Sequence, residues 1–259
     1  MPPKPSPPRL THFLCIPLVT PTSRSQLQAS LTTFREKTTG TRTAQNPDGI
    51  PAAAIRPLGT LHLTLGVMSL LTPERVESAL SLLKSLNLRE LIPVSGLVGS
   101  AKSGENEEGR VSLKGKGVDD ERTSLIMVTL RGLESMHTPS KTSILYAPPV
   151  DDLYLRSFCL KLREAFAAAD LLVPDSRPLL LHATILNTVY VPGVRGKGSG
   201  HGKNKAKLTI DATEILEYYE DFEWMSNVKV EKVAICRMGA QKKEDGTEEY
   251  VVEGEALMP

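Results

Sequence analysis

Two short segments of the chain carry the same alternation of apolar residues with histidine and threonine. Residues 61–65 read Leu-His-Leu-Thr-Leu, and residues 181–185 read Leu-His-Ala-Thr-Ile. Successive side chains of an extended strand point to opposite faces, so the histidine and threonine of each segment share one face. The spacing therefore predicts two strands, one presenting His62 and Thr64 and the other His182 and Thr184.

Two imidazoles and two hydroxyls facing one cleft would suit the chemistry of a phosphodiester. One neutral imidazole removes a proton from the attacking group, and the other, protonated, donates a proton to the departing oxygen. Histidine suits both roles because its ordinary pKa is about 6.5. Each threonine hydroxyl would donate to a non-bridging phosphate oxygen. We predict His62 and His182 as an acid/base pair, with Thr64 and Thr184 binding the phosphate.

The simpler alternative is that each segment is a half-buried strand whose polar face meets solvent. A single segment would favour that alternative, whereas the repetition favours the catalytic interpretation. Neither segment has a close spacing of histidine, carboxylate or Cys-x-x-Cys ligands, so the sequence predicts no metal site and no other cofactor.

Composition is that of a globular protein without a global preference for nucleic acid or membrane. The chain has 259 residues, 40% of them hydrophobic and 24% charged, with a formal net charge of +1. This length fits one large domain or two packed lobes. Any contact with RNA must then come from local basic patches. The three cysteines are widely spaced among apolar residues, which predicts buried, reduced thiols and favours the nucleus or cytoplasm.

The segments around the two motifs predict alternating strands and helices. Residues 1–10 are a proline-rich, disordered lead-in rather than a signal peptide, and no apolar run is long enough to cross a membrane. Residues 11–255 form a single domain. Strands are expected at 11–19, 60–68, 91–98, 125–130, 143–147, 179–190, 228–237 and 249–253. Helices are expected at 23–37, 72–87, 152–169 and 212–221. Residues 99–122 and 193–207 are expected to be mobile loops.

This order predicts a duplicated α+β lobe with sheets covered by helices on one face. Three further features are candidates for substrate binding. Arg237 could meet a phosphate or form a surface ion pair, and Tyr146 could stack on a base or belong to the core. The basic residues of 195–207 could contact an RNA backbone or simply be solvated.

The motifs resemble the paired signatures of the 2H phosphoesterase superfamily, also called LigT-like or 2′-5′ RNA ligase-like proteins. The strings at residues 59–70, 144–150 and 181–188 narrow the resemblance to one branch. It comprises the RNA ligase-like domain of A-kinase anchor protein seven and the phosphoesterase half of activating signal cointegrator complex subunit one. The resemblance implies a bilobal α+β fold, two pseudo-symmetric lobes of mainly antiparallel sheet with helices outside and a central cleft.

By the same resemblance, the protein is expected to be a metal-independent 2H phosphodiesterase. RNA or an oligonucleotide, 2′,5′-linked or 2′,3′-cyclic, would be the substrate. A non-catalytic RNA-binding or coactivator-complex subunit and an RNA end ligase are the alternatives. Partners would be RNA and a nuclear coactivator-type complex, with no membrane. No kinase-anchoring helix is evident, and the residues before Thr11 leave no room for an RNA-binding KH module.

Overall fold

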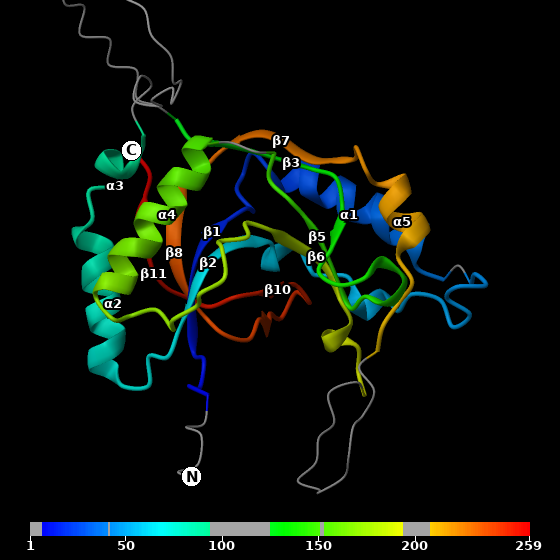
Figure 1. Ribbon diagram of the computed structural model, residues 1–259, viewed down its shortest axis with the longest axis horizontal. Helices are drawn as coiled ribbons and strands as arrows, with labels where there is room; N and C mark the ends of the chain where they lie inside the picture. Colours follow the sequence, from blue (N-terminus) through cyan, green and yellow to red (C-terminus); the bar gives the residue numbers. More distant parts are fainter. Residues whose placement is uncertain (1–6, 41, 94–124, 151–152, 194–207) are drawn as a thin grey trace, which may run out of the picture.

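The computed structural model describes residues 7–40, 42–93, 125–150, 153–193 and 208–259 (Figure 1). Its first sheet contains four strands in the order β11-β8-β1-β2, and every pair in it is antiparallel. The strands are β1 (His12–Pro17), β2 (His62–Met68), β8 (Lys232–Arg237) and β11 (Val252–Leu257). Two of these strands precede residue 70 and two follow residue 230, so the first sheet pairs segments that are far apart in the sequence.

The second lobe contains two smaller antiparallel sheets. One has the order β4-β5-β6, and the other pairs β3 with β7. A bridge between Leu130 and Pro149 joins the two sheets. The strands are β3 (Met127–Arg131), β4 (Glu134–Ser135), β5 (Ile144–Ala147), β6 (Ala183–Asn187) and β7 (Glu223–Lys229). A separate short hairpin pairs β9 (Gln241–Lys242) with β10 (Glu248–Glu249).

The long helices are exchanged between the two lobes. The first-half helix α1 (Arg24–Thr38) packs on β7 of the second lobe, whereas the second-half helix α4 (Leu153–Ala168) packs on β2 of the first. Helix α2 (Pro73–Ser85) lies against β11, and Figure 1 shows α2 and α4 together over the first sheet. The short helices are α3 (Leu88–Leu91), α5 (Thr213–Tyr218) and the 3-10 turns η1 (Ala52–Ala54), η2 (Leu58–Thr60), η3 (Pro139–Lys141) and η4 (Thr188–Tyr190).

Helix boundaries follow the local sequence. Thr72 caps α2 by accepting a hydrogen bond from the Arg75 N–H at 3.4 Å, and Pro73 occupies the first turn, where its missing N–H has no cost. The predicted apolar stripes are confirmed as buried. They are Leu27, Leu31 and Phe34 on α1, and Leu155, Phe158, Leu162 and Phe166 on α4. Burial of these stripes fixes which face of each helix meets its sheet.

One continuous apolar core runs through both lobes, because the exchanged helices contribute to it from each side. In the second lobe it is aromatic: Trp224 packs against Phe34, Tyr219 and Phe222, and its indole N–H donates to the Gly132 carbonyl at 2.8 Å. All three cysteines are buried and free. Among the described residues, none of the helices has the length and apolar character needed to span a membrane.

Several predicted boundaries need correction. Where a strand was expected at 91–98, the chain forms α3 (Leu88–Leu91), and residues 94–98 lie outside the described part. The strand expected at 179–190 is shorter, because β6 begins at Ala183 and the turn η4 follows it. The strand expected at 228–237 is two strands, β7 and β8, in different sheets. The loops expected at 99–122 and, apart from Gly193, at 193–207 lie outside the described residues, as does the predicted cap at residues 151–152.

Candidate active site

The first motif is presented by β2, the edge strand of the four-stranded sheet. Leu61, Leu63 and Leu65 are buried, while His62 and Thr64 are only half-buried, so the predicted alternation is confirmed. The His62 Nδ1 lies 2.8 Å from the Thr60 carbonyl oxygen, which can only accept, so Nδ1 carries the hydrogen. In the neutral ring Nε2 is then an acceptor, and it receives the Thr64 hydroxyl at 3.0 Å.

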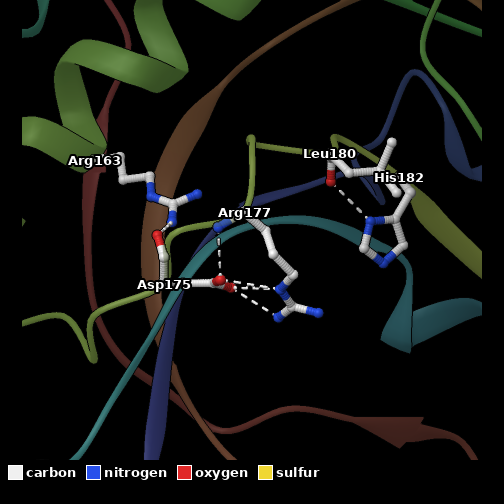
Figure 2. A network of polar contacts seen from close by, with 5 residues as sticks. All are labelled: Arg163, Asp175, Arg177, Leu180 and His182. Carbon is white, nitrogen blue, oxygen red and sulfur yellow. Dashed lines mark hydrogen bonds and ion pairs between the residues drawn. The ribbon is translucent and has the colours of Figure 1, made fainter.

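The second motif repeats this arrangement. His182 stands one residue before β6, and its Nδ1 lies 2.9 Å from the carbonyl oxygen of Leu180 (Figure 2). In both motifs, therefore, Nδ1 bonds the carbonyl two residues earlier, and Nε2 is the nitrogen that can accept a proton; at His62 it receives the Thr64 hydroxyl. The sequence repeat extends to the orientation and tautomer of the two imidazoles.

The structure brings the two motifs together at the junction of the lobes. Strand β2 contacts β6, and the segment that leads into β2 is bonded to β6. The Arg56 N–H donates to the Ile185 carbonyl at 2.8 Å, and Ile55 bridges to Leu186. His182 is also near enough for its charge to lower the pKa of His62. This placement is what a shared site requires.

Aromatic rings enclose His62. Its imidazole centroid is 4.7 Å from that of Phe13 and 5.3 Å from that of Tyr250. Beside it lies a hollow of about 190 Å³, whose lining includes the same two rings together with Cys15 and Cys236. Burial lowers the pKa of His62 to about 4; the Thr60 hydrogen bond opposes the shift, and the charges of His182 and Arg56 add to it. His62 is therefore neutral at pH 7.

Tyr146 lies beside His182 rather than in the open. The two ring centroids are 5.3 Å apart with the rings edge to face, and Tyr146 pairs with Thr184 across β5 and β6. Its side chain is 5% exposed, and its hydroxyl donates to the Glu134 carboxylate. Burial, followed by this carboxylate, raises the pKa of Tyr146 to about 12. Tyr146 therefore belongs to the core beside the motif histidine, and stacking of its ring on a base stays a prediction.

Comparison with known proteins identifies the family. Residues 10–257 match the AKAP7 2′5′ RNA ligase-like domain. The chain belongs to this family. The sequence is also 30% identical over 116 residues to C15D4.13c, an uncharacterized protein of Schizosaccharomyces pombe. That match spans 44% of this chain and 50% of the relative, so about half of the relative's length is covered.

Solved structures confirm the LigT-like α+β fold. Escherichia coli LigT in complex with 3′-AMP superposes with a TM-score of 0.50 at 15% identity, covering 96% of this chain and 98% of LigT. A structure described as a phosphoesterase gives the same TM-score, identity and coverage. At this identity the likeness shows the fold alone. The orientation of the two motif histidines comes from the hydrogen bonds of this chain.

Arg237 is bound to a carboxylate on the neighbouring strand. It lies opposite His12 in the pairing of β8 with β1, and it makes two hydrogen bonds to the Glu253 carboxylate. The preceding residue, Cys236, lines the hollow beside His62, so alternation along β8 directs Arg237 to the other face of the sheet. The structure shows the ion pair of Arg237 with Glu253, and a phosphate contact of Arg237 stays a prediction.

The sequence interpretation missed the turn that delivers His182 to the site. After α4 the chain runs along the first lobe, where the Val173 N–H donates to the Val67 carbonyl at 2.8 Å. Arg177 then closes a turn on the Asp175 carboxylate through its backbone N–H, Nε and Nη2, and Arg163 bonds the Asp175 carbonyl at 3.2 Å (Figure 2). These bonds hold the pKa of Asp175 well below its usual range. The Asp-x-Arg-Pro string at residues 175–178, just ahead of the motif, was the available signal.

Arg56 is the second residue that the sequence interpretation missed. It is buried, its backbone N–H is bonded to the strand of the second motif, and its charge acts on His62 of the first. Its only sequence signal is a basic residue within the otherwise apolar string Ala-Ile-Arg-Pro-Leu at residues 54–58, just ahead of the first motif. Within the described residues, no three histidine, cysteine or carboxylate side chains gather as a metal site would require, and metal-free chemistry stays a prediction.

Proposed function

We propose that this protein is a 2H phosphodiesterase that cleaves RNA or oligonucleotide phosphodiesters, 2′,5′-linked or 2′,3′-cyclic, by paired-histidine acid/base catalysis without a metal ion. One observation carries the proposal: two imidazoles on adjoining elements are oriented by equivalent Nδ1 hydrogen bonds, so Nε2 is the proton-accepting nitrogen of each neutral ring. At His62 this nitrogen receives the Thr64 hydroxyl, which would turn to the phosphate when substrate binds. Membership of an RNA ligase-like family and the 3′-AMP held by a LigT protein of the same fold support the substrate class.

The surroundings of the histidines suggest which is the base. His62 is enclosed by Phe13 and Tyr250, and burial keeps it neutral at pH 7. It would take the proton from an attacking water or hydroxyl through Nε2 as the new P–O bond forms. His182 would be protonated at the start of the reaction, and it would donate its Nε2 proton to the leaving oxygen as the old P–O bond breaks. One proton enters the pair and one leaves, so hydrolysis is balanced.

The threonines would hold the phosphate between the imidazoles. The Thr64 hydroxyl lies 3.0 Å from His62 Nε2, so a phosphate oxygen bound by Thr64 would also lie near the base. Thr184 is on the same face of β6 as His182, because residues two apart on a strand share a face. Donors fixed in this way favour the charge that develops on the phosphate oxygens in the transition state.

The test is turnover in EDTA. Purified protein is incubated with a 2′,5′-linked oligoadenylate or with 2′,3′-cyclic AMP, and the products are separated and identified by mass spectrometry. We expect hydrolysis, with a loss of at least about 100-fold in His62→Ala and in His182→Ala. His137→Ala is the matched control, because His137 is exposed on the loop after β4.

Each other outcome contradicts the proposal in a recognisable way. Binding of the oligonucleotide without turnover would indicate an RNA-binding or complex-assembly subunit. Joined rather than cleaved products would indicate an RNA end ligase. Full activity in both alanine variants would mean that the histidines are not the catalysts.

A further inference from the structure

A buried arginine adjoins the histidine site, and no carboxylate of the described residues forms an ion pair with it. Arg56 lies between the turns η1 and η2, and its side chain is only 4% exposed. Its backbone N–H donates to the Ile185 carbonyl, the residue after Thr184, so the position is fixed relative to the second motif. Burying a guanidinium costs free energy unless an anion or hydrogen-bond acceptors compensate it, so a buried arginine of this kind indicates a binding role.

The partners of Arg56 in the described part of the chain are aromatic rather than acidic. Its guanidinium carbon lies 3.6 Å from the ring centroid of Tyr190, which covers it on one side. No carboxylate of the described residues forms an ion pair with it, and its buried Nη2 has no hydrogen-bond partner there. The cation–π contact orients the group but supplies no negative charge.

Arg56 also acts electrostatically on His62 and on the tyrosine ring that packs against it. Its charge lowers the pKa of His62, together with burial and the charge of His182. Burial raises the pKa of Tyr250 to about 12, with Tyr190 adding to the shift and Arg56 opposing it. Tyr250 is the ring packed on His62, and Arg56 also hydrogen-bonds it, so the Arg56 side chain adjoins the first motif while its backbone is bonded to the second.

We propose that Arg56 binds the phosphate of the substrate, its buried Nη2 donating to a phosphate oxygen between the two motifs. The inference deepens the proposed function and rests on it for the location of the phosphate. A guanidinium suits this role because its planar array of donors matches phosphate oxygens and keeps its charge at every physiological pH. The anion would supply the counter-charge that the described residues lack.

Binding of adenosine 3′-monophosphate, measured by calorimetry in EDTA, tests the role without requiring turnover. We expect Arg56→Gln to bind at least tenfold more weakly than the unmodified protein, and Arg56→Lys, which keeps the charge without the planar fork, to bind several-fold more weakly. Arg89→Gln is the matched control, since Arg89 is exposed on α3 in a different hollow. Adenosine, which lacks the phosphate, should bind all four proteins alike.

The failure of this inference differs from the failure of the proposed function. Equal binding of the 3′-monophosphate by Arg56→Gln and the unmodified protein overturns the role of Arg56, as does absence of binding to the unmodified protein. Binding that depends on Arg56 without turnover of any phosphodiester overturns the enzymatic proposal and leaves Arg56 as an anion-binding residue. If circular dichroism shows that Arg56→Gln does not fold, Arg56→Lys decides, and unchanged binding by it overturns the inference.

Discussion

At the scale of residues, the two histidines are oriented alike but surrounded differently. Each imidazole is fixed through Nδ1 by the carbonyl two residues earlier. His62 is packed against Phe13 and Tyr250, whereas His182 meets one ring edge, that of Tyr146. Different environments for chemically identical groups are how one site obtains a base and an acid.

The buried position of His62 predicts a pH dependence of stability. Its pKa is about 4 in the fold and about 6.5 when unfolded. Between these values the unfolded chain binds a proton that the folded protein does not, so stability falls as pH decreases from about 6.5 to 4. Arg56 and His182 face the ring and oppose its protonation, while Thr60 favours it.

Replacing His62 removes this dependence. From pH 7 to 4 the unmodified protein should lose on the order of 2 kcal/mol more free energy of unfolding than His62→Gln does. Urea unfolding at the two pH values provides the measurement, with His137→Gln as the exposed-histidine control. Equal losses in the unmodified protein and His62→Gln would show that His62 is not held neutral by the fold.

The residue types and their alternation were enough to predict which side chains share a face, but not what fixes them. A period of two identifies His62 and Thr64 as neighbours on a strand. The bonds to the Thr60 and Leu180 carbonyls depend on backbone conformation that no pattern encodes. Arg56 was missed because its burial depends on residues far away in the sequence, and the ion pair of Arg237 could not be located because its partner Glu253 is on another strand.

At the scale of elements, α4 supports the first motif from behind. It packs on β2 through a buried stripe, and the chain that follows it runs across to His182. Because the helix covers the motif strand, we expect that damage to the helix packing lowers the free energy of unfolding.

Truncating one buried leucine of α4 tests this packing. Leu162 is 0% exposed, whereas Leu160 on the same helix is 37% exposed. Leu162→Ala should cost about 2–5 kcal/mol of unfolding free energy, since a cavity remains in the core. Leu160→Ala should cost less than about 1 kcal/mol. Thermal and urea unfolding of the two variants make the comparison, and similar losses would contradict the orientation of the helix.

Elements with strong local signals were predictable and those defined by pairing were not. The cap at Thr72 and the stripes of α1 and α4 identify helices through contacts within a few residues. By contrast, the mixture of apolar and polar residues continues from β7 into β8 through Val230 and Glu231, although the two strands belong to different sheets. Apolar periodicity indicates which side chains are buried and does not indicate the sheet to which a strand belongs, so the sequence predicted one strand where there are two.

At the scale of the whole molecule, the exchange of helices makes the two lobes one unit. Because α1 packs on the second lobe and α4 on the first, neither half of the sequence can complete its own sheet-and-helix layer. The repeated motifs correctly predicted two related lobes with a strand in each. The exchange was not predictable, since only the motifs are visibly repeated and packing partners lie far apart in the chain.

The central claim is that one histidine from each lobe acts on the same phosphate. The most direct measurement is kcat/KM for 2′,3′-cyclic AMP in the unmodified protein, His62→Ala, His182→Ala and the double variant. Groups that act as a unit are not additive, so each single variant should lose at least about 100-fold and the double variant little more than the worse single one. A double loss equal to the product of two independent losses, an unaffected single variant, or no turnover by the unmodified protein would contradict the claim.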